Sequence, residues 1–120
     1  MWETFNHRKF PRIKVKCDVT VKEQNSSDVF NTETENIGAG GICVFINKAL
    51  PSFSPVTLKI ELNDKNGTLP IECIGKVVWC IQNKTLHHGT SHYDVGIEFQ
   101  NISTANRERI RQFIQQKVTD

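Results

Sequence analysis

The run from Arg12 to Lys22 constrains the fold of this chain more than any other segment, because apolar and polar residues alternate along it without a break. Its apolar members are Ile13, Val15, Cys17, Val19 and Val21. Successive side chains of a β-strand point to opposite faces, so this pattern predicts a strand with one buried face. The β-branched residues in the run favour the same conformation. We therefore expect one continuous strand over residues 12–22.

Shorter strand-like segments follow this run, and turn residues separate them. The alternation predicts strands over residues 29–37, 42–46, 56–62, 71–80 and 93–99. Asn66-Gly67 suits a tight hairpin turn, and Gly75 predicts a bulge or bend within its strand. No helical pattern separates these strands. Together with the first run, they predict an all-β fold, a closed antiparallel sheet or small barrel of six strands.

The end of the chain changes to a helical period. Ile110, Phe113, Ile114 and Val118 recur at helical spacing, and either Ser103 or Thr104 can cap the start. This pattern predicts one amphipathic helix over about residues 103–118 that packs on the strands. The alternative use of the helix is as an interface for a partner protein.

Length and composition fit one small domain. A chain of 120 residues buries one hydrophobic core, and its 38% hydrophobic and 23% charged residues are ordinary for a globular protein. No apolar run approaches the roughly 20 residues that cross a bilayer, and the first residues lack a hydrophobic signal core. We therefore expect a cytoplasmic protein without membrane insertion. A net charge of +2 is too small to indicate a general DNA or RNA binder.

The cysteines and histidines raise the question of metal binding. Cys17, Cys43, Cys73 and Cys80 show no C-x-x-C spacing, which favours reduced core residues over disulfides or metal ligands. His87, His88 and His92 lie within six residues, and Cys80 would complete a zinc site. Because the same segment has the glycine and polar residues of a hairpin loop, we favour solvated histidines and predict no metal site.

Two fragments indicate a ligand site. Arg8 and Arg12 are four residues apart, in a basic cluster that also holds Lys9, Lys14 and Lys16; this cluster is either an anion trap or the solvated face of a strand. The second fragment is the glycine-rich corner over residues 36–41. Guanidinium groups bind phosphates and the acceptor edge of guanine bidentately, and glycines let a ligand approach the backbone. If the fold brings the fragments together, they suggest a guanine nucleotide site.

The same two fragments resemble the signature of PilZ domains, which are bacterial receptors for cyclic di-GMP. The family has an R-x-x-x-R segment followed by [D/N]-x-S-x-x-G; Arg8 and Arg12 match the first, and Asn36 and Gly41 match the ends of the second. Gly38 stands where the family usually has serine. Residues 75–79 and 93–99 look like later strands of the family. The resemblance implies a six-stranded antiparallel PilZ-type β-barrel with one C-terminal helix.

The resemblance also implies a role for each matched residue. Residues 1–12 would form a flexible arm whose two arginines grip phosphates and guanine, while residues 12–120 form the barrel and helix. Asn36 would hydrogen-bond a guanine, and glycines would keep the corner open. The ligand-binding candidates are Arg8, Arg12, Asn36, Gly38, Gly40 and Gly41, with His7 and Lys9 beside the arginine pair. Loss of one neutral hydrogen bond at Gly38 costs about 0.5–1.5 kcal/mol, a roughly two- to tenfold weaker affinity.

The resulting functional hypothesis is a receptor or adaptor that clamps cyclic di-GMP and signals to an unidentified effector protein. The alternative is a PilZ-type interaction module that has lost nucleotide binding. An enzyme is the third class, with His87, His92, Asp94 and Glu98 as candidates for acid–base chemistry. No motif organises these four, and Asp94 and Glu98 read as the solvent face of a strand. We therefore expect no catalytic residues and no cofactor besides the nucleotide ligand.

Overall fold

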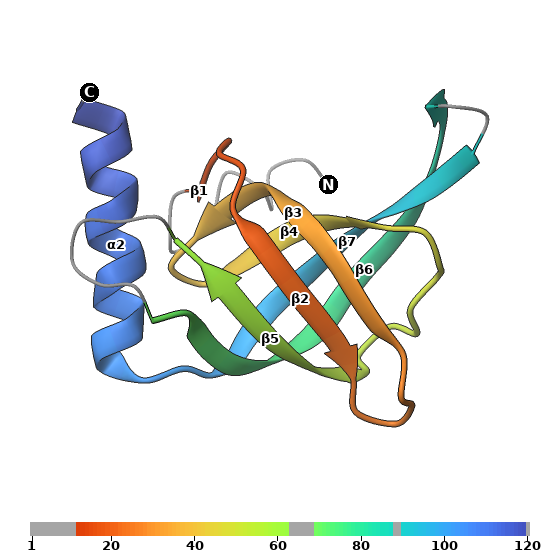
Figure 1. Cartoon of the computed structure of the whole chain (residues 1–120), viewed down its shortest axis with the longest axis horizontal. Coiled ribbons are helices and arrows are strands. Elements are labelled where there is room, and N and C mark those ends of the chain that lie inside the picture. Colours follow the sequence, from red (N-terminus) through yellow and green to blue (C-terminus); the bar gives the residue numbers. More distant parts are fainter. Residues whose placement is uncertain (1–11, 63–68, 88–89, 120) are drawn as a thin grey trace.

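The computed structural model describes residues 12–62, 69–87 and 90–119. In this part of the chain, seven strands precede one helix (Figure 1). The elements are β1 (Arg12–Ile13), β2 (Asp18–Glu23), β3 (Val29–Gly38), β4 (Gly41–Ile46), β5 (Pro55–Glu61), β6 (Ile71–His87), β7 (Thr90–Asn101) and α2 (Thr104–Thr119).

The strands form a closed antiparallel barrel. Neighbours run in the order β3-β2-β5-β6-β7-β4, and pairing of β3 with β4 closes the ring of six strands. The seventh, β1, adds two residues beside β3. Closure removes the free edges that an open sheet would expose. The predicted six-stranded barrel with one C-terminal helix is therefore confirmed.

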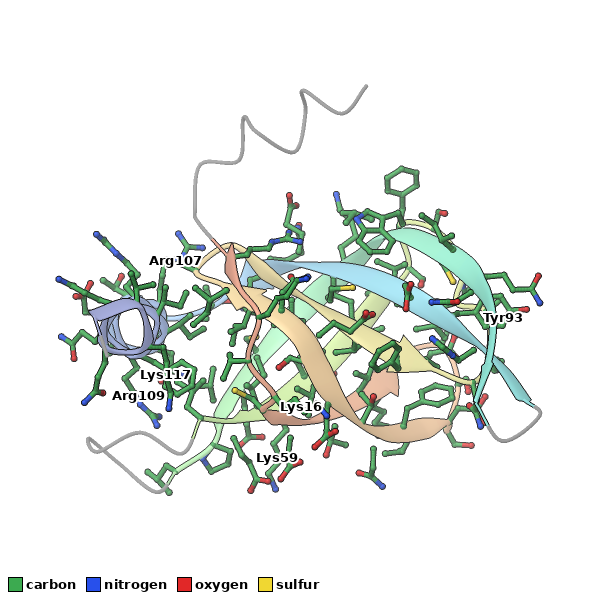
Figure 2. All side chains as sticks on the ribbon, turned by 90° about the horizontal axis from the view of Figure 1, so that it is seen from above. Lys16, Lys59, Tyr93, Arg107, Arg109 and Lys117 are labelled. Carbon is green, nitrogen blue, oxygen red and sulfur yellow. The ribbon has the colours of Figure 1, made fainter. Side chains whose placement is uncertain are left out.

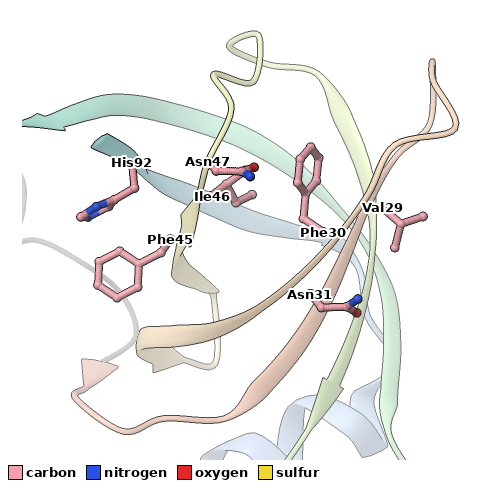
Figure 3. A pocket seen from close by; sticks show the side chains of 7 residues that line it. All are labelled: Val29, Phe30, Asn31, Phe45, Ile46, Asn47 and His92. Carbon is pink, nitrogen blue, oxygen red and sulfur yellow. The ribbon is translucent and has the colours of Figure 1, made fainter. Parts of the chain in front are cut away.

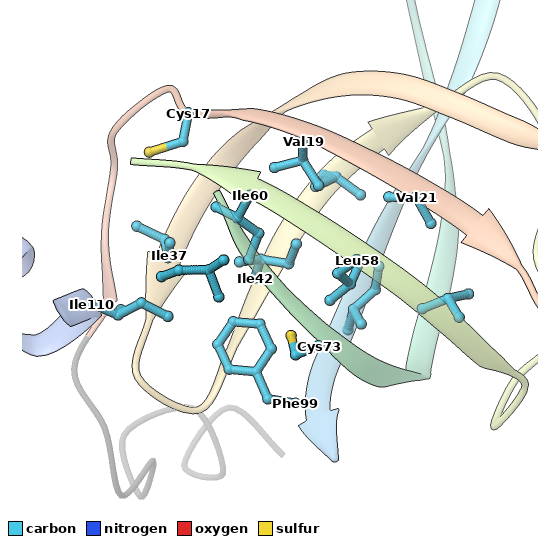
Figure 4. Close-up of a cluster of buried hydrophobic side chains, with 14 of the residues drawn as sticks. Cys17, Val19, Val21, Ile37, Ile42, Leu58, Ile60, Cys73, Phe99 and Ile110 are labelled. Carbon is cyan, nitrogen blue, oxygen red and sulfur yellow. The ribbon is translucent and has the colours of Figure 1, made fainter. Parts of the chain in front are cut away.

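The barrel interior is filled by the inward-facing residues of all six strands. The alternating positions of β2 are buried, and the side chains of Val21, Ile37 and Leu58 are completely inaccessible (Figure 4). Cys17 and Cys73 belong to this core, as predicted, and Cys80 packs against it. All four cysteines are free thiols.

The first predicted strand is wrong in one respect, because it is interrupted. The β1 pairing joins Ile13 to Ile37, whereas the β2 pairing joins Asp18 to Glu33, which is a shift of register by one residue. In the gap, the hydroxyl of Thr34 accepts from the Cys17 amide (2.9 Å) and donates to the Val15 carbonyl (2.6 Å). A side chain thus replaces two ladder bonds that a continuous strand would make.

The predicted loop over residues 86–92 is also wrong. β6 continues to His87 and β7 begins at Thr90, so most of this segment lies on paired strands. A register shift between Asn83 and His87 lets the ladder run past the expected end. Figure 1 shows this hairpin projecting at the end of the barrel opposite α2. The predicted Asn66-Gly67 turn lies outside the described residues.

The bulge predicted at Gly75 is confirmed, because the pairing with β7 shifts between Ile74 and Gly75. A Cβ atom at Gly75 would come 3.0 Å from Cδ1 of Leu58, so glycine permits close packing there.

Helix α2 closes one end of the molecule against β1 and β3 (Figure 2). Ser103 is the residue that caps it, since its hydroxyl accepts from the Asn106 amide at 3.0 Å. Ile110, Phe113 and Ile114 are buried as predicted, but Val118 is 67% exposed. The last turn of α2 reaches beyond the strands against which it packs (Figure 1), so the apolar stripe ends at Ile114. No described helix is long and apolar enough to cross a bilayer.

Candidate functional site

A row of four paired residues crosses the outer wall of the barrel. Trp79 on β6 pairs with Gly96 on β7, Gly96 pairs with Cys43 on β4, and Cys43 pairs with Asn36 on β3. The neighbours of Gly96 and Cys43 along each strand are buried in the core, so these two face outward. With strands about 4.8 Å apart, the row spans roughly 14 Å. We call this set the outer row.

A bulge at one end of the outer row brings an extra side chain to it. The pairing of β3 with β4 shifts between Thr34 and Asn36, which leaves Glu35 without a partner of its own. A β-bulge places two residues opposite one, so Glu35 and Asn36 both lie beside Cys43. The thiol of Cys43 donates to Oε2 of Glu35 at 3.3 Å.

A second bulge lies at the other end of the outer row. The pairing of β6 with β7 shifts between Val77 and Trp79, with Val78 as the extra residue. The indole ring of Trp79 then covers Gly96, where a Cβ atom would overlap the ring. The half-buried indole provides an aromatic surface on the wall, and glycine is required beneath it.

Asn36 carries an unsatisfied acceptor. Its side-chain Oδ1 is buried and has no hydrogen-bond partner among the described residues. Buried polar atoms without a partner are rare in native proteins and call for an explanation. An amide oxygen in this state suits a ligand that donates hydrogen bonds, as the N–H groups of guanine do.

Arg12 lies next to the same row. It pairs with Gly38 at the edge of β3, two residues beyond Asn36. Its positive charge is close enough to lower the pKa of the Cys43 thiol, although burial and the nearby Glu35 carboxylate together raise that pKa. The fold therefore brings Arg12 and Asn36 together at one end of the outer row.

A pair of carboxyl groups lies beside the row. Burial, a hydrogen bond to Asp94 and the negative charge of Asp94 raise the pKa of Glu35 from 4.5 to about 7, against the lowering effect of the Cys43 hydrogen bond. Asp94 also accepts from Nδ2 of Asn83 at 3.3 Å and lies 3.6 Å from Nε2 of His92. Two carboxyl groups share a hydrogen bond only when one is protonated, so the site holds a proton near neutral pH.

Glycines form the turn between β3 and β4. Gly38 pairs with Gly41, and Ala39 and Gly40 connect them. A Cβ atom at Gly41 would overlap the backbone oxygen of Ile97, so glycine there permits the close approach of β4 to β7. Gly41 thus has a packing role, and its part in keeping the corner open for a ligand stays a prediction.

The predicted site residues are only partly covered by the described chain. His7, Arg8 and Lys9 lie outside it, so their roles stay predictions. The structure places Arg12, Asn36, Gly38, Gly40 and Gly41 at one corner of the barrel.

The sequence did not predict a role for Trp79 or Glu35, nor the pairing of Asp94 with Glu35. Asp94 and Glu98 both lie on the outer face of β7, as predicted, but Asp94 is half-buried there and hydrogen-bonded to Asn83, whereas Glu98 is exposed. The consecutive Val77-Val78 before Trp79 breaks the alternation and was the available signal for the second bulge. No group of residues in the described part could hold a metal ion, and the side chains of His87 and His88 lie outside that part.

Comparison with known proteins decides the family. The model of the PilZ domain matches residues 6–116 of the chain. The chain belongs to the PilZ domain family. None of the curated proteins compared with this PilZ domain matches it.

Solved structures with the same fold include other PilZ proteins. The domain is similar to the inhibitor of motility MotI (DgrA) of Bacillus subtilis, with a TM-score of 0.79 and 20% identity over 95% of this chain and 53% of that one. For the MrkH–c-di-GMP complex of K. pneumonia, the TM-score is 0.70 and the identity 14%, over 94% of this chain and 53% of that one. For the PilZ domain of YcgR from Escherichia coli with c-di-GMP, the TM-score is 0.66 and the identity 12%, over 90% of this chain and 88% of that one. The chain thus spans about half the length of MotI and MrkH.

Proposed function

We propose that this PilZ domain is a non-enzymatic receptor for cyclic di-GMP that binds the nucleotide against the outer row and signals to a partner protein in the cytoplasm. The observation that carries the proposal is that Arg12, paired with Gly38 and close to Cys43, lies at the same end of the outer row as Asn36, whose buried Oδ1 is unsatisfied. Arg12 offers a permanent cation for a phosphate, and Asn36 offers an acceptor for a guanine N–H group. Family membership and two similar structures with c-di-GMP support the choice of ligand.

The outer row supplies what a dinucleotide needs besides charge. Trp79 offers an aromatic face at the end of the row opposite Asn36. Stacking of a base on an aromatic side chain is worth about 1–3 kcal/mol. Between these ends lie only Gly96 and the buried thiol of Cys43, so the wall there has no bulky side chain that would keep a nucleotide away.

The arginine arm completes the proposed site. Arg12 begins the described chain, and Arg8 precedes it by four residues. In the proposal, both guanidinium groups bind the phosphates or the guanine acceptor edge, and the arm orders when the nucleotide binds. Glycine at position 38 removes one hydroxyl that the family usually offers, so we expect affinity in the micromolar range or tighter.

Isothermal titration calorimetry with cyclic di-GMP tests the proposal. We expect binding by the wild-type protein and a loss of about tenfold or more for Arg12→Ala, because each charge-assisted hydrogen bond contributes about 1.5–3 kcal/mol. Arg111→Ala is the matched control, since Arg111 is exposed on α2 and pairs with Glu108. Absence of heat at roughly tens of micromolar nucleotide would refute the receptor function.

The signalling half of the proposal needs a separate test. Co-purification from the native bacterium with and without the nucleotide should recover a partner whose association changes with the ligand. The Arg8→Ala and Arg12→Ala proteins should lose this response together with nucleotide binding. If both variants keep the partner interaction unchanged, the domain is an interaction module whose output does not depend on the nucleotide.

A further inference from the structure

The pairing of β3 with β4 ends halfway along the two strands. Their ladder runs from Gly38↔Gly41 to Thr34↔Val44, but β3 extends back to Val29 and β4 extends forward to Ile46. The hydroxyl of Thr32 donates to the Phe45 carbonyl at 2.6 Å where the ladder stops. Beyond this point the strands separate around a cavity of about 380 Å³ (Figure 3). We call this cavity the β3–β4 slot; its lining residues are Val29, Phe30, Asn31, Phe45, Ile46, Asn47 and His92.

The backbone of β3 turns hydrogen-bonding groups toward this slot. The Thr34 amide donates to Cys17 and the Asp28 carbonyl accepts from Glu23, so both of these groups face β2. Because backbone groups alternate sides along a strand, the intervening Val29 and Asn31 face the opposite way, toward the slot. Among the described residues, neither has a ladder partner on that side.

The backbone groups of β4 alternate in the same way. The Gly40 carbonyl accepts from Phe99 and faces β7, whereas the Phe45 carbonyl accepts from Thr32 and faces β3. Because β4 ends at Ile46, the Phe45 carbonyl is the last carbonyl of this strand that faces β3, and Thr32 already bonds it. In the described barrel, the slot is thus the place where the paired strands β3 and β4 separate, and β3 provides its open edge.

The side chains of the slot form an apolar floor with exposed walls. Ile46 is buried in the core and Phe30 packs against that core, so both form the floor. On the walls, Val29 is 51% exposed and Phe45 is 40% exposed, and the Phe45 ring meets His92 edge-on with centroids 4.7 Å apart. Sites that bind an extended peptide combine open backbone groups, which pair with the peptide main chain, with apolar surfaces, which hold its side chains. The slot has both features.

Fixed contacts hold both ends of the slot. Thr32 occupies one end, and Lys48 closes the other by bonding Oδ2 of Asp28 at 2.6 Å and Oε1 of Glu23 at 3.3 Å. The slot is therefore short and preformed, which lowers the entropy lost when a ligand binds. Its lining residues include no lysine or arginine, and Lys48 at its end is already paired with Asp28 and Glu23. The slot therefore favours a neutral peptide, which would find amide and backbone partners there, over a phosphate.

We propose that the β3–β4 slot binds a short extended segment of a partner protein, which adds as a strand to the open edge of β3. Its backbone pairs with Val29 and Asn31, and one apolar side chain lies on Phe30 and Ile46. Alternate side chains of a strand point to opposite faces, so the neighbours of that apolar residue remain in solvent. This interaction surface is independent of nucleotide binding, although β3 carries Asn36 at its other end.

Three peptides test the strand addition without changing the protein. The probe is the acetylated and amidated peptide Thr-Val-Thr-Phe-Thr, titrated into the labelled full chain and followed by amide NMR shifts. We expect shifts at Val29 and Asn31, and slower hydrogen exchange of their amides. N-methylation at the odd residues and at the even residues of the peptide gives two further probes. One should bind like the parent and the other at least about tenfold more weakly, since only one set of N–H groups faces β3.

Variants of β3 provide the second test. The Asn31 amide faces the slot, so Asn31→Pro removes one edge donor and leaves the ladder with β2 intact. Asn31→Ala keeps that donor and is the matched control. We expect peptide binding to be lost in the proline variant and kept in the alanine variant. Circular dichroism and thermal unfolding confirm that both remain folded.

Three results would overturn the inference. Equal weakening by both N-methylated peptides would show capture of a side chain alone, without strand pairing. Absence of any shift around the slot at millimolar peptide would exclude a peptide site. Shifts at Val29 and Asn31 that grow with protein concentration alone, together with dimers in sedimentation, would assign the slot to a second copy of this chain.

Discussion

The indole ring of Trp79 occupies the space above Gly96 that a side chain at position 96 would fill. The Cε2, Nε1 and Cζ2 atoms of the ring are the nearest atoms to a Cβ built on Gly96. The two residues are paired across β6 and β7, next to the bulge at Val78. This contact fixes the ring on the outer wall, at the opposite end of the outer row from Asn36.

Replacement of Gly96 by alanine should therefore displace the indole. We expect a loss of about 1–3 kcal/mol in the free energy of unfolding, as for other overpacked sites, and weaker cyclic di-GMP binding. Urea denaturation and calorimetry measure the two effects. In a Trp79→Ala background, Gly96→Ala should cost little, because the overlapping ring is absent. An equal loss of stability in both backgrounds would contradict the contact.

Glu35 should make folding stability depend on pH. Its pKa is raised from 4.5 to about 7 in the folded protein, so the folded state binds a proton that the unfolded state has released. The resulting stabilisation is full below pH 4.5 and is lost as the pH rises toward about 7. Denaturant unfolding across this range should show stability falling with pH. Glu35→Gln, which cannot ionise, should flatten this part of the profile; parallel profiles would contradict the assignment.

Nucleotide affinity should follow the same proton. Above pH 7, the carboxylates of Glu35 and Asp94 lie beside a site proposed for an anionic ligand, so affinity should fall as Glu35 ionises. Calorimetry at a series of pH values should show this decrease in the wild type and a smaller one in Glu35→Gln. His92 lies beside Asp94, and Arg12 lies near Cys43, so the difference between the two proteins is the informative quantity.

Thr34 replaces ladder bonds in the gap between β1 and β2. Its buried hydroxyl bonds the Cys17 amide and the Val15 carbonyl. Thr34→Val keeps the shape but leaves both backbone groups without this partner, so we expect a loss of at least about 2 kcal/mol in unfolding free energy. Thr34→Ser retains the hydroxyl and removes one methyl group, so we expect a smaller loss of about 1 kcal/mol in unfolding free energy. If valine proves as stable as serine, the bridging role is wrong.

Phe53 adopts a backbone conformation that L-residues disfavour. Its φ is 65°, and its side chain is 68% exposed. Backbone bonds hold it in place, from its own amide to Val77 at 2.6 Å and from Ser54 to Pro51 at 3.3 Å. Glycine avoids the steric cost of this conformation, about 1–2 kcal/mol. Part of that gain is offset by the larger conformational entropy that glycine loses on folding. Thermal and denaturant unfolding should show Phe53→Gly more stable than Phe53→Ala by about 1 kcal/mol; the opposite order would exclude strain.

Strand periodicity was enough to predict the barrel, but not its irregularities. The alternation from Ile13 to Val21 correctly assigned the inward side chains, because burial of one face determines it. It could not reveal the break before Asp18, since a tertiary contact from Thr34 causes that break. The extension of β6 to His87 was missed for a similar reason: pairing with β7 overrides the turn propensity of a polar segment.

The candidate site shows the same division. Short motifs identified Arg12 and Asn36, because the chemistry of their side chains is readable without a structure. Trp79 and Glu35 reach the site only because of two bulges, one at each end of the outer row, next to Gly96 and Cys43. The register across four strands that brings these bulges into one row is not encoded in any local pattern. In the sequence, Asp94 is an ordinary alternating residue; its hydrogen bond with Glu35 depends on the pairing of distant strands.

A crystal structure of the protein with cyclic di-GMP is the most direct test of the proposed receptor. It should show the nucleotide against the outer row, with a phosphoryl or guanine acceptor bonded to the guanidinium of Arg12 and a guanine N–H group bonded to Oδ1 of Asn36. A nucleotide bound elsewhere, with Arg12 directed into solvent and Asn36 still without a partner, would contradict the proposal.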